Sequence, residues 1–226
     1  MSGAMCTVGV GLSIDSTRIT TLVCWLPKAH GRGGAMSDPM MFTYRGVSVH
    51  QNGYVGDVFR ALFRTFKPVK VLEIGTADGG LTILLRDLLD EAGLKATDLW
   101  TCDPAVRDRP HLLHPGIMYY AVDALNSTVL EYHVKYAEGP ALVLCDGGNK
   151  PAEFNKYAAF LRSGDVIMAH DFAVDHDQFY TEMKDKHWNW WEIEDAQIRD
   201  ACRKYQLEPF MQAEFQRVAW ACRRKA

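Results

Sequence analysis

The sequence predicts an α/β fold in which helices cover both faces of a mostly parallel sheet. Two observations predict it. Short apolar segments of strand character alternate with segments of helical period after Pro68, and the first of those strands runs through a glycine-rich turn directly into a helix. Composition agrees, because 48% of the 226 residues are hydrophobic and 23% are charged, as in a domain with a buried core.

Length and local composition divide the chain into an extension and one domain. A chain of 226 residues suits a single domain. Residues 1–41 are rich in Gly, Ser and Thr without a sustained helical period, so we expect an N-terminal arm or cap before a domain at 42–226. The apolar stretch Ile19–Leu26 is too short to span a membrane and lacks the basic start of a signal peptide. We therefore expect a cytoplasmic protein without a membrane partner.

Charge and cysteine usage restrict the partners. The formal net charge is −3, which leaves no basic excess to neutralise a phosphate backbone. A small-molecule substrate is expected and a nucleic-acid partner is not. The six cysteines form no CxxC pair and no zinc spacing with histidines, which indicates reduced thiols. A homo-oligomer is possible, and the sequence does not decide it.

The individual elements follow from the apolar period and from the positions of proline and glycine. Asp57–Phe66 has apolar residues at helical spacing, and Pro68 ends that helix. Further helices are expected at Leu81–Ala92, Ala152–Leu161 and Ala196–Tyr205. Parallel strands are expected at Lys70–Ile74, Asp98–Cys102, Met118–Val122, Ala141–Cys145 and Asp165–Ala169. Phe215–Cys222 is strand-like and is expected to form a reversed edge strand, followed by a solvated end at Arg223–Lys225.

The turn after the first of these strands reads VLEIGTADGG from Val71 to Gly80. Gly75 and Gly79 let the backbone turn tightly and approach a ligand without a Cβ clash. Glu73 adds a carboxylate, which repels a pyrophosphate but suits a cationic group, and the strict GxGxxG phosphate cradle is missing. A glycine turn of this kind also occurs in unrelated α/β proteins, so its context has to decide.

Acids follow the next two strands. Asp103 comes after Trp100-Thr101-Cys102, and Asp123 ends the strand that begins at Met118. In parallel sheets the ligand lies beyond the carboxyl ends of the strands. Asp103 can accept hydrogen bonds from both ribose hydroxyls of an adenosine, and we expect Asp123 on the adenine side.

These three strand ends together resemble those of class I S-adenosylmethionine (SAM)-dependent methyltransferases, over about Phe42–Cys222. More narrowly, Glu73-Ile74-Gly75-Thr76 with Gly79-Gly80, preceded by Gly46 and Gln51, resembles the cephalosporin hydroxylase-like and macrocin O-methyltransferase-like families. The resemblance implies a Rossmann-like sheet of seven strands, mostly parallel with a reversed edge strand. It implies cofactor contacts at Glu73, Gly75, Asp103 and Asp123, with Gln51 closing over the cofactor. The rest of the expected cofactor site is Thr76, Ala77, Gly79, Ala124 and Asp146.

A second acidic cluster is expected where the fourth and fifth strands end. Asp146 follows the fourth strand, and His170-Asp171 follows the fifth. Oxygen ligands suit Mg²⁺, and the position is similar to the metal site of catechol-type and macrolide-type O-methyltransferases. The catechol-type pattern has Asp-Asn where this chain has His170-Asp171, and a histidine ligand leaves Mn²⁺ or Fe²⁺ as the second choice. Alternatively, Asp146 contacts the cofactor or caps a helix, and His170 is packed in the core.

A metal at Asp146, His170 and Asp171 would hold two vicinal oxygens of an acceptor and orient one of them for attack on the methyl group. Candidate bases are Lys150, His170 and His176. Lys150 and His176 also have the alternative of being solvated surface residues.

The segment after the fifth strand interrupts the alternation of strands and helices. Asp175-His176-Asp177 is interpreted as part of a mobile lid rather than as a metal site. The aromatic run His187–Trp191 contains three tryptophans that can stack on an acceptor or cover the core as a local cluster.

The leading hypothesis is a SAM-dependent, metal-assisted O-methyltransferase acting on a small hydroxylated acceptor such as a sugar, a macrolide or another secondary metabolite. Three alternatives remain open. They are a metal-independent methyltransferase with another acceptor atom, a non-catalytic cofactor-binding module, and a dinucleotide oxidoreductase, which Glu73 and the missing third glycine disfavour.

Overall fold

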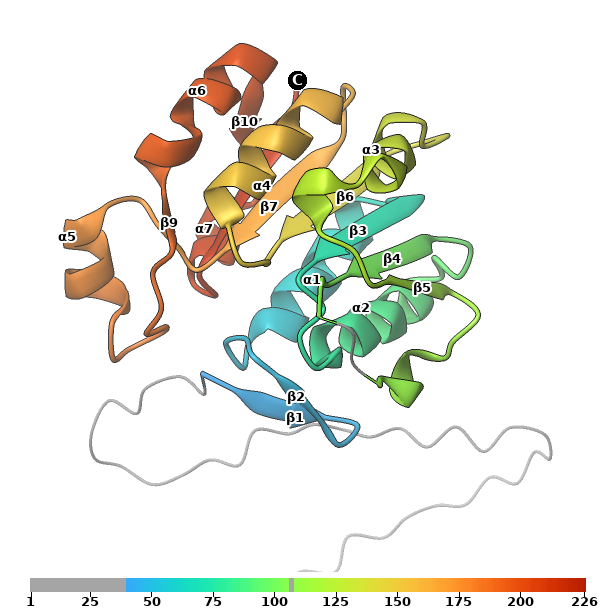
Figure 1. Ribbon diagram of the computed structural model, residues 1–226. Coiled ribbons are helices and arrows are strands. Elements are labelled where there is room, and N and C mark those ends of the chain that lie inside the picture. Colours follow the sequence, from blue (N-terminus) through green and yellow to red (C-terminus); the bar gives the residue numbers. More distant parts are fainter. Residues whose placement is uncertain (1–39, 106–107) are drawn as a thin grey trace, which may run out of the picture. The chain divides into compact units, whose positions relative to one another are not determined.

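A computed structural model describes residues 40–105 and 108–226 (Figure 1). The arm or cap expected at 1–41 lies outside these residues except for its last two. Within the described part of the chain, no helix is both long and apolar enough to cross a membrane.

The centre of the fold is a sheet of seven strands in the order β10-β11-β7-β6-β3-β4-β5. Five neighbouring strands are parallel, and β11 runs antiparallel to both β7 and β10. This confirms the predicted seven-stranded, mostly parallel sheet, with the reversed strand lying just inside the short outer strand β10. In chain order the strands are β3 (Lys70–Ile74), β4 (Asp98–Cys102), β5 (Ile117–Tyr120), β6 (Ala141–Cys145), β7 (Val166–His170), β10 (Leu207–Pro209) and β11 (Trp220–Lys225).

Helices cover both faces of the sheet, as predicted (Figure 1). Helices α1 (Val55–Thr65), α2 (Gly80–Glu91) and α7 (Gln212–Gln216) contribute to one hydrophobic cluster, and α3 (Thr128–Lys135), α4 (Lys150–Tyr157) and α6 (Asp195–Tyr205) contribute to the other. Side chains of the sheet alternate between the two clusters, because successive residues of a strand point to opposite faces. On β6, for example, Leu142 and Leu144 belong to the first cluster and Val143 to the second.

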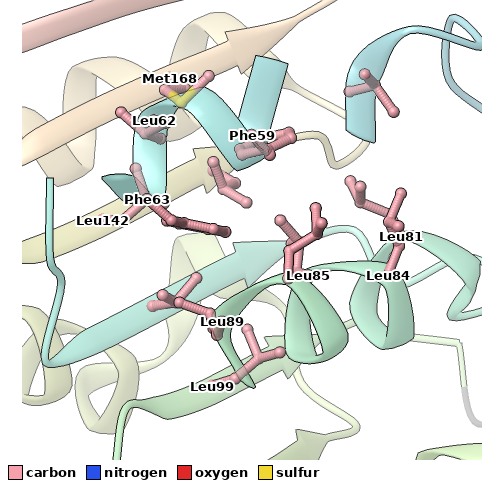
Figure 2. Close-up of a cluster of buried hydrophobic side chains, with 14 of the residues drawn as sticks. Phe59, Leu62, Phe63, Leu81, Leu84, Leu85, Leu89, Leu99, Leu142 and Met168 are labelled. Atoms are coloured by element: carbon pink, nitrogen blue, oxygen red, sulfur yellow. The ribbon is translucent and has the colours of Figure 1, made fainter. Parts of the chain in front are cut away.

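The first cluster is built around the contact between α1 and α2 (Figure 2). Phe59 and Phe63 of α1 and Leu85 and Leu89 of α2 are almost completely buried. Figure 2 shows these side chains between the two helices and the strands. Burial of large side chains contributes about 1.5–3 kcal/mol each, so this contact anchors the helix that follows the glycine turn.

Short elements complete the fold. A hairpin of β1 (Phe42–Tyr44) and β2 (Val47–Val49) contacts α2. The segment between β7 and α6 contains a small parallel pair, β8 (Phe172–Ala173) and β9 (Ile193–Glu194), around α5 (His176–Gln178) and the π-helical turn η4 (Phe179–Met183). The 3₁₀ turns are η1 (Pro110–Leu112), η2 (Ala124–Asn126) and η3 (Ala158–Phe160).

The C-terminal prediction is partly wrong. The strand expected at Phe215–Cys222 begins only at Trp220, and Phe215 belongs to helix α7. Arg223, expected in a solvated end, is buried within β11 and contacts Gln212 and Asp195. Phe215 and Val218 are apolar at a spacing of three residues, which fits a helical turn facing the core, whereas residues on one face of a strand are two apart.

Candidate functional site

The glycine turn joins the ends of two strands. Gly75 has a φ of +93°, and a Cβ there would lie 2.1 Å from the carbonyl oxygen of Asp146. The Gly75 N–H donates to the carbonyl of Cys102 at 2.8 Å, and the Asp146 N–H donates to the carbonyl of Ile74 at 2.9 Å. Only glycine allows this close approach, so the turn brings the ends of β3, β4 and β6 together.

Helix α2 begins at the same turn. Gly79 precedes it with a φ of +85°, and a Cβ on Gly80 would lie 2.1 Å from the carbonyl oxygen of Ser48. The β1–β2 hairpin therefore packs directly against the first turn of α2. Thr76, expected in the cofactor site, is instead buried under the turn, where its hydroxyl bonds that of Thr101 at 2.7 Å.

Glu73 lies inside the sheet, one residue before the strand ends. Its carboxylate accepts a hydrogen bond from the Thr82 hydroxyl at 2.5 Å. Burial raises the pKa of Glu73 to about 7, and the charge of Asp146 adds a smaller contribution in the same direction. Hydrogen bonds from Thr101 and Thr82 lower this pKa but do not outweigh burial. The group therefore titrates near neutral pH.

Asp103 is held by its neighbours at the end of β4. Its carboxylate accepts from the backbone N–H groups of Ala77 at 3.0 Å and Ala105 at 2.8 Å. The guanidinium of Arg109 lies 3.2 Å from Asp103 and also donates to the Ala77 carbonyl at 2.8 Å. Arg109 thereby ties Asp103 to the glycine turn. Arg109 could not be predicted from the sequence, because nothing in the local pattern distinguishes it from a solvated loop arginine.

Asp123 stabilises the loop after β5. It accepts from the Leu125 N–H at 2.8 Å and from the Asn126 side chain at 2.6 Å, and so caps η2. Beside it lies a cavity of about 470 Å³. Six of the ten residues expected to contact the cofactor line this cavity, namely Gly75, Ala77, Asp103, Asp123, Ala124 and Asp146. Gln51, Glu73, Thr76 and Gly79 are not in its lining.

Glu153 shapes one wall of the same cavity. Its carboxylate accepts from the N–H groups of Gly147 and Asn149, each at 3.1 Å. Asn149 in turn caps α4 by accepting from Ala152 N–H at 3.2 Å. Glu153 was also missed from the sequence, where it reads as one more polar residue of a helix.

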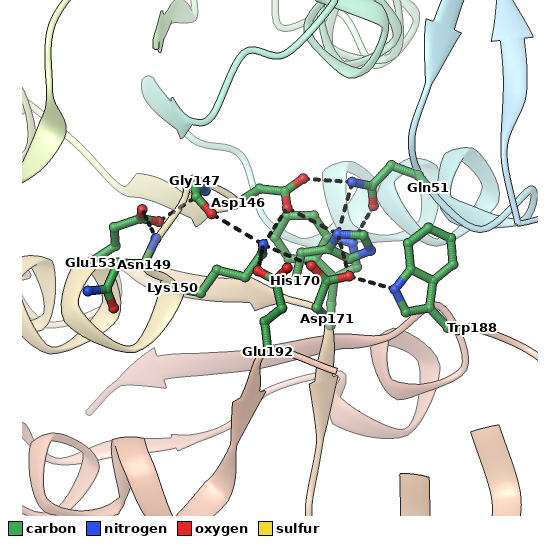
Figure 3. A network of polar contacts seen from close by, with 11 residues as sticks. Gln51, Asp146, Gly147, Asn149, Lys150, Glu153, His170, Asp171, Trp188 and Glu192 are labelled. Atoms are coloured by element: carbon green, nitrogen blue, oxygen red, sulfur yellow. Dashed lines mark hydrogen bonds and ion pairs between the residues drawn. The ribbon is translucent and has the colours of Figure 1, made fainter. Parts of the chain in front are cut away.

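Asp146, His170 and Asp171 come together at the ends of β6 and β7 (Figure 3). One ligand atom from each lies within 4.8 Å of the others. The His170 Nδ1 is 3.1 Å from Asp146 Oδ1 and 3.4 Å from Asp171 Oδ1. The three residues that the sequence nominated for a metal are therefore neighbours in space.

His170 and Asp171 influence each other's charge. Burial lowers the pKa of His170, but the carboxylates of Asp171 and Asp146 outweigh burial and raise it. Burial raises the pKa of Asp171, but the nearby charges of His170 and Lys150 outweigh it, so this pKa is lowered. Asp171 has a φ of +57° and accepts from the Trp188 indole N–H at 2.6 Å. A non-glycine residue in this region stores strain that surrounding contacts must offset.

Gln51 contacts this cluster rather than the cofactor cavity (Figure 3). The Trp220 indole N–H donates to the Gln51 carbonyl oxygen at 2.8 Å, and this orients the amide because the indole nitrogen is only a donor. The Gln51 amide nitrogen then donates to Asp146 at 2.7 Å and lies 3.2 Å from His170 Nδ1. Gln51 is thus a buried residue that positions Asp146.

Lys150 is buried at the start of α4. Its ammonium lies 2.8 Å from Asp171, 2.7 Å from Glu192 and 3.6 Å from Asp146. Burial opposes the charge, but the carboxylates of Asp146 and Asp171 raise the pKa of Lys150 above its ordinary value. The alternative that Lys150 is a solvated surface residue is therefore wrong. His176, by contrast, is exposed and lies outside the cluster.

A second cavity of about 410 Å³ also borders the glycine turn. It shares Gly75, Ala77 and Asp146 with the first. The remaining lining consists of Met41, His50, His170, Asp171, Trp188 and Trp190.

The tryptophans of the aromatic run His187–Trp191 differ in position: some cover the core, and one is exposed at a cavity. Trp188 is buried and packs in a small cluster with Phe179 and Met183. Trp191 stacks on Phe179 with a centroid distance of 5.5 Å. Trp190 is 42% exposed and lines the second cavity, so it is the tryptophan best placed to contact a ligand.

Solved structures with a similar arrangement of strands and helices include two of CmcI. A CmcI structure with Mg and SAM is 18% identical with a TM-score of 0.58, over 82% of this chain and 77% of that chain. A CmcI structure with SAH (S-adenosylhomocysteine) is 16% identical with a TM-score of 0.58, over 96% and 97%. The chain has the class I SAM-dependent methyltransferase fold.

Other solved structures share this methyltransferase fold, although the sequence matches no family model and no curated protein. An O-methyltransferase family protein from Burkholderia thailandensis is 13% identical with a TM-score of 0.51, over 76% of this chain and 55% of that chain.

The residues at the second cavity fit a divalent metal. Two carboxylates and one imidazole are hard and intermediate ligands of the kind that Mg²⁺, Mn²⁺ and Fe²⁺ accept. They lie at the carboxyl ends of adjacent parallel strands, where ligands bind in methyltransferase-like sheets. Gln51 orients Asp146 and Trp188 orients Asp171, which supplies the outer hydrogen bonds that metal ligands usually have.

Proposed function

We propose that this protein is a SAM-dependent methyltransferase that methylates an oxygen of a small hydroxylated acceptor with the help of a divalent metal. The observation that carries the proposal is the pair of cavities that share Gly75, Ala77 and Asp146. One cavity contains the acids expected for an adenosine cofactor. The other contains the candidate metal ligands and an exposed indole, so the two reactants would meet at the shared wall.

The first cavity is proposed to hold SAM. Asp103, fixed by Ala77 and Arg109, would accept hydrogen bonds from the ribose hydroxyls. Asp123 and Ala124 would line the adenine end. Glu73 is close behind the turn, and its carboxylate form would favour the cationic end of SAM.

The second cavity is proposed to hold the acceptor, which would be a sugar, a macrolide or another secondary metabolite. Asp146, His170 and Asp171 would hold the metal, Mg²⁺ first and Mn²⁺ or Fe²⁺ second. When bound, the metal lowers the pKa of an acceptor hydroxyl and supplies charge stabilisation. Trp190 would contact the acceptor through its ring face.

The base that removes the acceptor proton is proposed from the same cluster. His170 lies among the reacting groups, whereas Lys150 in the described arrangement already carries a proton held by three carboxylates. We therefore favour His170 as the base, in a site where Asp146 and Asp171 alone hold the metal, because a protonated lysine has no lone pair to accept a proton.

A transfer assay tests the proposal. The full chain would be incubated with methyl-labelled SAM and a panel of hydroxylated acceptors, with Mg²⁺ or with a chelator. Label transfer that requires metal is expected.

The variants Asp146→Asn and Asp171→Asn should lose metal-dependent turnover while SAH affinity changes less than about threefold, because neither residue is the main cofactor anchor. Asparagine is chosen at 171 because it tolerates the positive φ.

Asp177→Asn is the matched control, since Asp177 lies in the same segment but is almost fully exposed. It should behave as the parent protein. Full activity of both cluster variants in chelator would refute the metal-assisted reaction.

One observation favours a metal-independent methyltransferase as the second candidate. The Lys150 ammonium already neutralises charge in the cluster, so the acids do not require a metal to be stable. Titrating metal against turnover separates the two candidates.

A further inference from the structure

We propose that the Lys150 ammonium is a tethered cation that competes with the divalent metal for Asp146 and Asp171, so that Lys150 sets the metal affinity of the site. This inference rests on the metal site of the proposed function. It concerns a role for Lys150 other than proton transfer.

The geometry of the ammonium carries the inference. Its nitrogen lies 2.8 Å from Asp171 Oδ2 and 3.6 Å from Asp146 Oδ1, so it contacts both acidic members of the candidate ligand set. A protonated lysine has three donors and no lone pair. It can neutralise these carboxylates, but it cannot join them as a ligand of the same metal.

Lys150 also has partners outside the ligand set. Its ammonium lies 2.7 Å from Glu192 Oε2 and donates to the Gly147 carbonyl at 3.2 Å. Glu192 comes from the segment before β9 and its side chain is half-exposed. When the metal takes Asp171, the ammonium keeps Glu192 and Gly147, so no buried charge is left without a partner. This makes exchange of the two cations feasible.

Electrostatics gives the direction of the effect. A second cation about 4 Å from a carboxylate opposes metal binding, and at an effective dielectric constant of about 20 a unit charge at that distance changes affinity by more than tenfold. Removal of the ammonium leaves two carboxylates facing each other across the site. Metal affinity should therefore rise, and the metal-free protein should become less stable.

The experiment measures Mn²⁺ binding by electron paramagnetic resonance on the full chain after chelator treatment. Lys150→Met removes the charge with similar chain length and should bind Mn²⁺ at least about tenfold more tightly than the parent. Lys150→Arg keeps the charge and should bind within about threefold of the parent. Lys70→Met is the control, because it changes the net charge equally but lies at the amino end of β3, whereas the cluster lies at the carboxyl ends of β6 and β7. It should leave Mn²⁺ affinity unchanged.

Thermal unfolding of the same samples gives a second readout, because a merely structural role of Lys150 would not change the gain in unfolding temperature that Mn²⁺ produces. Lys150→Met should unfold at a lower temperature than the parent without metal and should gain more from Mn²⁺. Should that variant fail to fold, Glu192→Gln supplies the test. It removes the outside partner, so the ammonium stays with Asp171 and Mn²⁺ affinity should fall at least threefold.

Equal or weaker Mn²⁺ binding by Lys150→Met, or no Mn²⁺ binding by parent and variant alike, overturns the inference. For Glu192→Gln the contradicting result is unchanged affinity. SAH calorimetry on the same samples separates this failure from that of the proposed function. Intact SAH binding together with Mn²⁺ binding that Lys150→Met leaves unchanged refutes only the tethered cation. Absence of Mn²⁺ binding by the parent protein also refutes the metal site of the proposed function, and loss of SAH binding by the parent protein refutes the cofactor assignment.

Discussion

Two buried carboxylates of the site, Glu73 and Asp171, have opposite charge preferences because of their nearest partners. Both are disfavoured as anions by burial. Glu73 receives a hydrogen bond from the neutral Thr82 hydroxyl, and its pKa stays raised at about 7. Asp171 contacts the Lys150 ammonium and the His170 imidazole, and its pKa is lowered. The charges beside Asp171 therefore outweigh burial, whereas the hydrogen bonds to Glu73 do not.

The raised pKa of Glu73 predicts a pH-dependent stability. Between the ordinary pKa of 4.5 and the folded value of about 7, the folded state binds more protons than the unfolded state. Stability therefore falls as pH rises through this range, by an amount on the order of 3 kcal/mol. Glu73→Gln lacks this titration, so relative to the parent it should become increasingly stable from pH 5 to pH 8. Urea unfolding across that range is the measurement, and parallel curves for both proteins would contradict the assignment.

SAM affinity should respond in the opposite direction, because the cationic cofactor favours ionised Glu73. In the parent protein the affinity is expected to increase as pH rises through about 7, and in Glu73→Gln this increase should disappear. Calorimetric titrations at pH 6 and pH 8 compare the two proteins directly.

Among the elements, the β3–turn–α2 unit is the one on which both cavities depend. Gly75 allows β3 to meet Asp146, and Gly80 allows the β1–β2 hairpin to meet α2. The observed bounds of β3, β4 and β6 match the predicted ranges residue for residue. Of the three, β6 is continuously hydrophobic, as expected for a strand buried on both faces.

Substitutions at three glycines separate the cost of a positive φ from the cost of a steric clash with a Cβ. Gly93 has a φ of +77° with open space around it, so Gly93→Ala should cost only about 1 kcal/mol. Gly75→Ala adds the clash with Asp146 and should cost at least about 3 kcal/mol and weaken SAH binding. Gly148 also lines the cofactor cavity but has open space and no positive φ, so Gly148→Ala should cost less than about 0.5 kcal/mol. Chemical unfolding of the three variants checks the order, and equal costs at Gly75 and Gly148 would contradict this account of the turn.

Elements that depend on distant contacts were harder to predict. The start of β11 was placed too early, because Phe215 and Val218 face the core from a helical turn. Trp188 and Trp190 both line the second cavity, yet Trp190 is exposed whereas Trp188 is buried and donates to Asp171. Spacing in an irregular segment does not determine which way its side chains point.

For the whole molecule, the sequence pattern predicts where the strands end but not the hydrogen bonds that connect residues far apart in the chain. Asp103, Asp146 and Asp171 follow their strands directly, so the sequence predicts that they meet at one edge of the sheet. Gln51 and Trp220 are separated by 169 positions, and no local pattern relates them. Their hydrogen bond exists only because the segment before α1 reaches β11 in the folded chain.

The order of the strands also explains why the C-terminal strand β11 packs against the candidate metal site. Strand β11 pairs with β7 in the reversed direction and places Trp220 opposite His170. Trp220 is fully buried, with its ring 4.8 Å from that of His170. The candidate metal ligand is therefore packed against the last strand of the fold.

The central claim is that the cavity beside the glycine turn binds SAM through Asp103, and calorimetry of the full chain with SAH and with NAD tests it most directly. The account predicts saturable SAH binding by the parent protein, no measurable NAD binding, and about tenfold weaker SAH binding by Asp103→Asn, which loses a charged acceptor for the ribose hydroxyls. Tight NAD binding without SAH binding, or SAH binding that Asp103→Asn leaves unchanged, would contradict it.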